Sequence, residues 1–183
     1  MQGKDLTPRE TYIQLAVREF RRTKKLADGA VVQITPEQFF AASSEGDNSI
    51  AIIVKHVGGN LLSRWTNFLN SDGEKPGRNR DLEFEITAGD TQRSLMAQWE
   101  SRWAALFSAL EPLSGADLER MVTIRGESLT VLQAINRQLT HYSYHVGQIV
   151  YVAKHYTGRS WRSLSVPKGK SAEFNAKPAK YTK

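Results

Sequence analysis

The chain has 183 residues, of which 40% are hydrophobic and 24% are charged, and it contains no cysteine. This length fits one domain with a proper hydrophobic core, and the absence of cysteine excludes disulfides, cysteine nucleophiles and thiolate metal ligands. The N-terminal segment is polar and the longest apolar run, Ile50 to Val54, is much too short to cross a bilayer. We therefore expect a cytoplasmic protein that is not inserted in a membrane.

The net charge of +6 is concentrated at the C-terminus. Residues 167–183 carry five lysines and one glutamate, a balance of +4, whereas residues 1–166 carry 20 basic and 18 acidic groups, a balance of +2. We expect a helical domain over residues 1–166 and a basic, loosely ordered, flexible tail over residues 167–183. A solvated tail is the simpler explanation of this charge. No nucleic-acid partner is expected, because no known recognition motif is present.

Two motifs predict helix starts in the first forty residues. The sequence TPRE at residues 7–10 places a Thr cap before Pro and Glu, which is typical of a helix N-terminus. That helix is expected to end near Ala27, before the turn signal Asp28-Gly29, and its apolar face is expected to include Leu15. The same signal at residues 35–40 predicts a second, short helix.

Three further long helices are indicated by apolar residues that recur every three or four positions. They are expected from about residue 49 to 70, from about residue 91 to 110, and from a Ser128 cap to residue 157. Alternating residues at 121–125 predict a strand of a small hairpin. Four long amphipathic helices with long irregular connections predict an all-α four-helix bundle.

The connection over residues 71–89 is long, polar and rich in turn residues. It carries Arg78, Arg80, Asp81 and Glu83. Such a loop is either a lid or binding loop, whose arginines hold a carboxylate or phosphate, or a solvated charged loop. The second interpretation is the simpler one, and we expect it here.

Three of the four histidines lie in one stretch, LTHYSYHVGQIVYVAKH. His141 and His145 are four residues apart on a predicted helix, so their Cβ atoms are expected about 5–6 Å apart. Two such imidazoles can converge on one metal ion, although histidine pairs of this spacing are also common on helix surfaces. His155 lies about 15 Å from His145 along the helix axis, too far to join the pair.

His56 supplies the third imidazole of the predicted site. It lies midway along the second long helix, at the edge of the apolar stripe, and a bundle core is where facing helices assemble metal sites. With His141 and His145 it gives three protein ligands and leaves coordination positions open, as in catalytic sites. The alternative is a core-edge histidine bonded to a backbone carbonyl.

The ligand set narrows the chemistry. Tyr142 stands where a zinc protease motif has its Glu, so that motif is absent. A mononuclear three-histidine site suits Zn²⁺, Ni²⁺ or Fe²⁺ and disfavours Mg²⁺ or Ca²⁺. Asn60, Arg64 and Gln148 follow the histidines by one or two turns and are expected to line the pocket or to orient a ligand. Alternatively, they are polar residues at the edge of the bundle.

Two stretches carry a resemblance to a known family: IAIIVKHVGGNLLSRW on the second long helix and HYSYHVGQIVY on the last. They resemble the DinB/YfiT-like superfamily, and further segments are similar to a bacterial branch of DinB-like proteins without an assigned reaction. The resemblance implies a four-helix bundle with His56, His141 and His145 as ligands, and Gln148 matches the motif HxxxHxGQ. It also implies homodimers and a metal-bound low-molecular-weight thiol.

Two hypotheses about function remain. The first is a metal-dependent enzyme, a thiol-dependent S-transferase or a hydrolase acting on a small molecule, with Zn or Ni as the favoured ion and Fe as the third choice. The second is a non-catalytic bundle, a binding or stress-associated protein whose metal is structural or absent. The lack of an obvious general base favours the second, and the three histidines favour the first.

Overall fold

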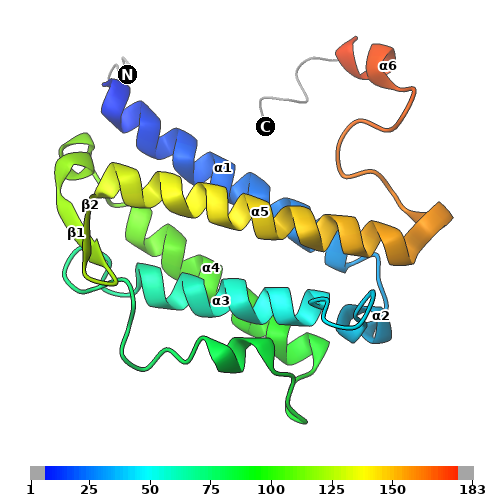
Figure 1. Ribbon diagram of the computed structural model, residues 1–183. Helices are drawn as coiled ribbons and strands as arrows, with labels where there is room; N and C mark the ends of the chain where they lie inside the picture. Colours follow the sequence, from blue (N-terminus) through cyan, green and yellow to red (C-terminus); the bar gives the residue numbers. More distant parts are fainter. Residues whose placement is uncertain (1–6, 177–183) are drawn as a thin grey trace.

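The computed structural model describes residues 7–176 (Figure 1). The helices are α1 (Pro8–Val31), α2 (Pro36–Phe40), α3 (Ile50–Trp65), α4 (Gln92–Leu110), α5 (Val131–Thr157) and α6 (Ser171–Asn175). Strands β1 (Met121–Ile124) and β2 (Glu127–Thr130) form one antiparallel hairpin, and short 3₁₀ turns lie at Asp81–Phe84, Gly115–Glu119 and Gly158–Ser160. The predicted all-α bundle is confirmed, with the hairpin as its one small sheet in the described part of the chain.

The four long helices pack as two pairs. Helix α1 lies along α5, and α3 lies along α4, while α3 also contacts α5 across the bundle (Figure 1). The contact between α3 and α5 places the second and the last long helix side by side. These are the two helices that carry the histidines.

Helix α1 runs four residues further than predicted. It begins with the expected capping box, in which Thr7 and Glu10 bond each other's backbone N–H groups. It continues through Asp28-Gly29 because both residues have tertiary roles. Asp28 accepts hydrogen bonds from Trp99 and Lys24, and Gly29 lies so close to Leu164 that a Cβ would stand 2.8 Å from the leucine methyl. The tertiary contacts of Asp28 and Gly29 therefore outweigh their local preference for a turn, and the predicted helix end near Ala27 is wrong.

The apolar face of α1 also differs from the prediction in one position. Leu15, which was expected to face the core, is 42% exposed, whereas Ile13, Ala16 and Phe20 are buried. The buried positions follow intervals of three and four, and Ala16 and Phe20 were expected among them, so the helical period was correct and Leu15 lies beside the buried face.

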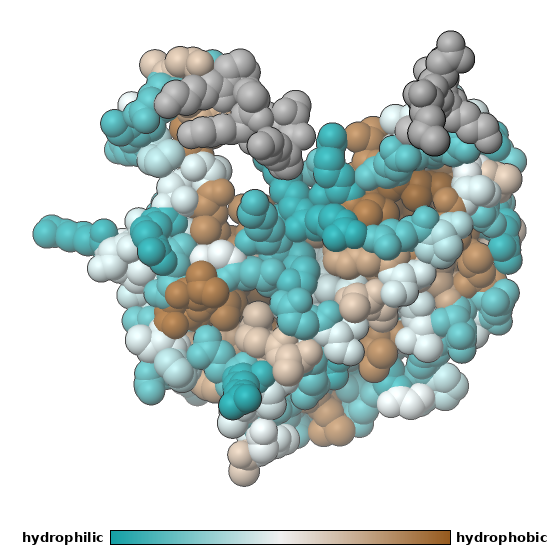
Figure 2. Space-filling view, turned by 180° about the vertical axis from the view of Figure 1, so that it is seen from behind, coloured by the Kyte–Doolittle hydropathy of each residue, from teal (hydrophilic) through white to brown (hydrophobic). Residues whose placement is uncertain are grey.

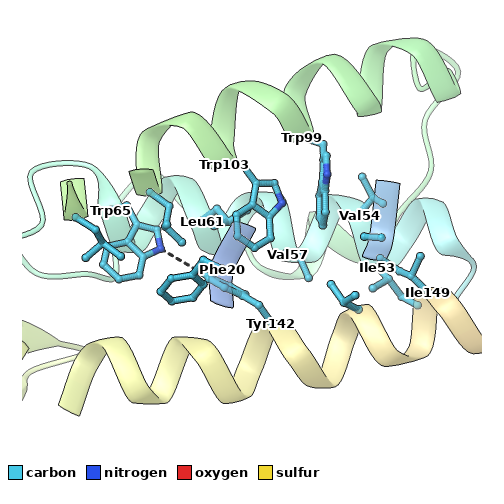
Figure 3. Close-up of a cluster of buried hydrophobic side chains, with 14 of the residues drawn as sticks. Phe20, Ile53, Val54, Val57, Leu61, Trp65, Trp99, Trp103, Tyr142 and Ile149 are labelled. Atoms are coloured by element: carbon cyan, nitrogen blue, oxygen red, sulfur yellow. Dashed lines mark hydrogen bonds between the residues drawn. The ribbon is translucent and has the colours of Figure 1, made fainter. Parts of the chain in front are cut away.

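Aromatic side chains dominate the centre of the bundle (Figure 3). Phe20 from α1 packs edge-on against Trp65 and Trp103, with ring centroids 6.1 and 6.4 Å apart. Tyr142 from α5 is fully buried beside them and accepts a hydrogen bond from Trp65 Nε1 at 3.0 Å. Each such side chain contributes about 1.5–3 kcal/mol by burial, and together they hold α3 and α5 in register.

The hairpin was predicted at the right place, but the start of α5 was not. Thr130, and not Ser128, caps α5, because Ser128 pairs with Thr123 in the ladder. Arg125 and Gly126 both have positive φ, 56° and 75°, as a tight two-residue turn requires.

The chain after α5 packs against the C-terminal end of α1. Gln33 hydrogen-bonds the backbone of Arg162 through both ends of its amide, and Trp161 and Leu164 pack partly buried against the core. Helix α6, which stands apart from the bundle in Figure 1, falls within the predicted tail. The rest of that tail, residues 177–183, lies outside the described residues, so the domain boundary at residue 166 stays a prediction.

The surface opposite to the view of Figure 1 is largely hydrophilic, with hydrophobic residues in separate patches (Figure 2). Among residues 7–176, no helix combines the length and the apolar character that a membrane crossing requires.

Candidate metal centre

The structure brings together the three histidines that the sequence singled out. His56 on α3 and His141 and His145 on α5 each offer a ring nitrogen, and these three atoms lie within 4.8 Å of one another. The ring centroids are 4.7–5.6 Å apart, in edge-to-face arrangements. His155 is exposed and packs against Tyr156, outside the cluster, as the helical rise predicted.

His56 is oriented by a residue that was not predicted to belong to the site. Glu83, from the 3₁₀ turn Asp81–Phe84, places Oε2 at 2.9 Å from Nδ1 of His56, and both side chains are more than 90% buried. Because an ionised carboxylate can only accept, Nδ1 of His56 donates this hydrogen bond, and Nε2 is the nitrogen left for a metal ion. A carboxylate bonded to the far nitrogen is the usual support of a metal-binding histidine.

Arg78 in turn fixes Glu83. Its Nε and Nη2 donate to Oε1 and Oε2 of the carboxylate at 2.7 and 2.9 Å, a two-pronged contact. Burial alone would raise the pKa of Glu83, but the bonds from Arg78 and His56 outweigh it and lower that pKa below its ordinary value. Glu83 therefore remains ionised at neutral pH.

Gly59 leaves the space that Glu83 occupies. A Cβ at this position would lie 2.0 Å from Glu83 Oε1, far inside any contact distance. The glycine costs helix stability in the middle of α3, and the close approach of the carboxylate to His56 is what it permits.

The connection over residues 71–89 was expected to be solvated, and this expectation is wrong for its two key residues. The side chains of Arg78 and Glu83 are only 5% and 9% exposed, and Phe84 covers His56 at 5.1 Å between ring centroids. Arg80 and Asp81 are exposed, as expected. Phe84 lies between Leu82 and Ile86, the other two large apolar residues of this connection, and it is the one that packs on His56.

His145 also has an oriented ring. Its Nδ1 lies 2.9 Å from Oε1 of Gln148. Because an amide oxygen only accepts hydrogen bonds, Nδ1 donates to it and Nε2 is left free to bind a metal ion. The pKa of His145 is lowered, mainly by burial and further by the charge of His56. Gln148 thus contacts His145, and its role in binding stays a prediction.

His141 is the most strongly perturbed of the three. Burial, followed by repulsion from His145 and His56, lowers its pKa to about 3. It is therefore neutral at physiological pH, the form in which an imidazole binds a metal. Its Nδ1 is buried and has no hydrogen-bond partner among the described residues. Such an orphaned polar atom among three clustered imidazoles fits a site that holds an ion or a ligand which the chain itself does not supply.

Asn60 and Arg64 line the cavity beside His56 and His141, but both have structural partners. Asn60 Oδ1 accepts a hydrogen bond from Tyr142 at 2.9 Å, and Arg64 donates to the carbonyl of Gly73 and to Glu74. The two residues therefore support the wall of the cavity, which has a volume of about 640 Å³. Such a volume is in the range of small-molecule sites.

The comparisons with known proteins give a family and no function. Residues 8–170 match the family model described as "Protein of unknown function (DUF1572)". No curated protein and no solved structure matched the chain. Because the match covers most of the sequence, including all three clustered histidines and Glu83, the chain belongs to the DUF1572 family.

Proposed function

We propose that this protein is a metal-dependent enzyme that uses His56, His141 and His145 to hold one divalent transition-metal ion. Zn²⁺ and Ni²⁺ are the favoured ions, with Fe²⁺ as the third choice, because all three protein ligands are imidazoles. The observation that carries the proposal is the convergence of three ring nitrogens within 4.8 Å from two helices. A set of three protein ligands is typical of catalytic sites, whereas structural zinc sites use four.

The residues around the histidines support the same interpretation. Glu83 holds the proton on Nδ1 of His56 and so presents Nε2 to the cluster, and Gln148 does the same for His145. Burial keeps His141 neutral. The chain thus brings three imidazoles together in one place, so that this ordering does not have to accompany binding.

An ion bound there would act as a Lewis acid and would make a coordinated water or thiol more acidic. We propose a thiol-dependent S-transferase or a hydrolase that acts on a small molecule. The chain has no cysteine, so a thiol must come from a low-molecular-weight cofactor or from the substrate. The bundle and the placement of the histidines support including this family in the DinB/YfiT-like superfamily.

The first experiment measures metal content and turnover together. The chain, purified without a histidine tag and supplied with Zn²⁺ or Ni²⁺, should retain about one ion per molecule, and it should convert an activated electrophile in the presence of a common thiol. His145→Ala should lose both properties, and His155→Ala, which changes an exposed histidine on the same helix, should keep both. Metal retention below roughly 0.2 per chain would contradict the proposal.

The same experiment tests the non-catalytic alternative. If the metal is structural, His145→Ala should lower the melting temperature, and no thiol or electrophile should be consumed by the wild-type protein. Metal-dependent turnover that disappears in the variant would exclude that alternative.

We also propose, from the resemblance alone, that the chain forms a homodimer. Light scattering should give twice the chain mass of 20.6 kDa, and a mass of one chain would contradict this.

A further inference from the structure

The cavity next to the histidine cluster has an unusual lining. Five arginines contribute to it, and no aspartate or glutamate does among the described residues: Arg64, Arg78, Arg80, Arg125 and Arg137. They come from α3, from the connection that covers the site, from the hairpin turn and from α5. Four separate segments of the fold therefore place the five guanidinium groups along one cavity.

Two of these arginines are committed to the scaffold. Arg78 donates hydrogen bonds to Glu83 from two nitrogens. Arg64 is buried and donates hydrogen bonds to Gly73 and Glu74. Their charges are matched by these carboxylates, which lie behind the cavity wall. They set the shape of the site, and of the two only Arg64 keeps a buried donor, Nε, without a partner among the described residues.

The other three arginines have donors to spare. Arg125 contacts Glu74 through Nε alone, at 3.1 Å, and Arg137 contacts Glu127 through Nη1 alone, at 2.9 Å. Each side chain is about half exposed. A guanidinium carries five N–H donors, so each can bind a further anion without giving up its present partner.

Arg80 has no carboxylate partner within the described part of the chain. Its guanidinium carbon lies 5.2 Å from the centre of the Phe84 ring, and Phe84 in turn packs on His56. The stacking positions this charge at the edge of the histidine cluster without neutralising it. The cavity therefore keeps a positive charge: its five arginines face four acids in the described part of the chain. Glu74, Glu83 and Glu127 form ion pairs with them, and Asp72 accepts from the backbone N–H of Arg125.

Gln138 provides a second, independent sign of a ligand. It lines the same cavity, is only 3% exposed, and its Oε1 is buried without a hydrogen-bond partner among residues 7–176. A buried amide oxygen without a partner is costly unless something else supplies a donor. A hydroxyl or amide group of a bound molecule would do so.

We infer that the substrate of this site carries a carboxylate or phosphate group, which Arg80, Arg125 and Arg137 receive while the reacting end of the molecule lies at the histidines. This inference rests on the proposed function, since it takes the histidine cluster as the reacting centre. Planar guanidinium groups suit the paired oxygens of carboxylates and phosphates, and a positively charged wall beside the histidines would fix the orientation of the molecule.

The test uses phenyl phosphate and phenylacetate as probes, with benzyl alcohol as the neutral analogue. Calorimetric titrations are run on the full chain, both metal-loaded and after dialysis against a chelator, because a metal ion could itself bind an anion. At least one of the two anions should bind in both states, benzyl alcohol should bind at least tenfold more weakly, and the stronger anion identifies phosphate or carboxylate as the preferred group.

Arg80→Gln and Arg137→Gln should each weaken anion binding about tenfold, the loss of roughly one charge-assisted hydrogen bond. Arg120→Gln is the matched control: Arg120 is similarly exposed and paired with one acid, Asp117, but lies outside the cavity. Circular dichroism confirms that each variant folds. Equal anion affinity of all three variants, or failure of both anions to bind the chelator-treated chain, would overturn the inference.

The outcomes also separate this inference from the proposed function. Retained metal binding with arginine-independent anion binding would overturn the inference alone. Arginine-dependent anion binding by a chain that retains no metal would support the anion site and contradict the proposed function.

Discussion

Glu83 and His56 are 27 residues apart in the chain, yet the carboxylate lies 2.9 Å from the imidazole Nδ1. The pair connects the long loop after α3 to the middle of α3 itself. Arg78 holds the carboxylate from the other side, so a loop that looks solvated in the sequence is anchored at the histidine cluster. The consequence is that changes in this loop should alter both metal affinity and stability.

Glu83→Gln tests this connection. The variant keeps the size of the side chain but removes the two-pronged carboxylate contact of the buried Arg78, which keeps only its longer contact with Glu74, and weakens the support of His56. Metal affinity should fall 10–100-fold, the usual effect of losing such a support, and stability should fall by about 3–5 kcal/mol, as when one partner of a buried ion pair is removed. Chelator competition and urea unfolding measure the two effects.

The neighbouring exposed Glu85 offers the control for that experiment. Glu85→Gln should leave both quantities unchanged. If Glu83→Gln behaves like Glu85→Gln, the loop does not support the site.

Gly59→Ala tests the close approach of Glu83 from the opposite side. The new methyl would overlap Glu83 Oε1, so the carboxylate must move and metal affinity should drop. Gly147→Ala, on α5, meets no atom within 4 Å and should stabilise the protein by about 0.5–1 kcal/mol through helix propensity. Chelator competition measures the metal affinity of Gly59→Ala, and thermal unfolding measures the stability of both variants. A stabilising Gly59→Ala with unchanged metal affinity would show that the space is not needed.

Much of this site was predictable because its signals are local. The spacing of His141 and His145 places them on one helix face, and His56 lies at the edge of a clear apolar stripe. Glu83 and Arg78 gave no such signal, because the loop has no period and its contacts depend on the tertiary fold. Similarly, the sequence Asp28-Gly29 is typical of a turn, but the segment is helical: Asp28 bonds Trp99, and Gly29 packs against Leu164. Prediction from local sequence patterns was wrong where contacts with residues distant in the sequence determine the structure.

Tyr142→Phe tests the hydrogen-bonded link between the core and the cavity wall. Its hydroxyl accepts from Trp65 Nε1 and donates to Asn60 Oδ1, so its removal leaves two buried polar groups without partners. We expect a loss of about 1–3 kcal/mol in unfolding free energy. Tyr151→Phe, at a tyrosine that is 75% exposed, is the control, and equal stability of the two variants would contradict the structural role.

Asp90→Asn tests a pH-dependent contact near the start of α4. Burial raises the pKa of Asp90, but bonds from Lys55 and Thr87 outweigh it and lower that pKa below its ordinary value of 3.8. A lowered pKa in the folded state means that the carboxylate contributes stability above the unfolded-state pKa, and that this contribution is lost as pH falls through the folded-state value.

The variant should therefore be less stable than the wild type at pH 7, and the difference should shrink as the pH is lowered below about 4. Denaturant unfolding at several pH values measures it. A difference that is constant with pH would show that the charge of Asp90 has no part in it.

Binding of one ion by three histidines from two helices can be measured by calorimetric titration of Zn²⁺ and Ni²⁺ into the untagged chain and its four single histidine-to-alanine variants. We predict a stoichiometry of about one for the wild type and for His155→Ala, and loss of the tight site in His56→Ala, His141→Ala and His145→Ala. Tight binding that survives in any of those three, or that depends on His155, would contradict the account.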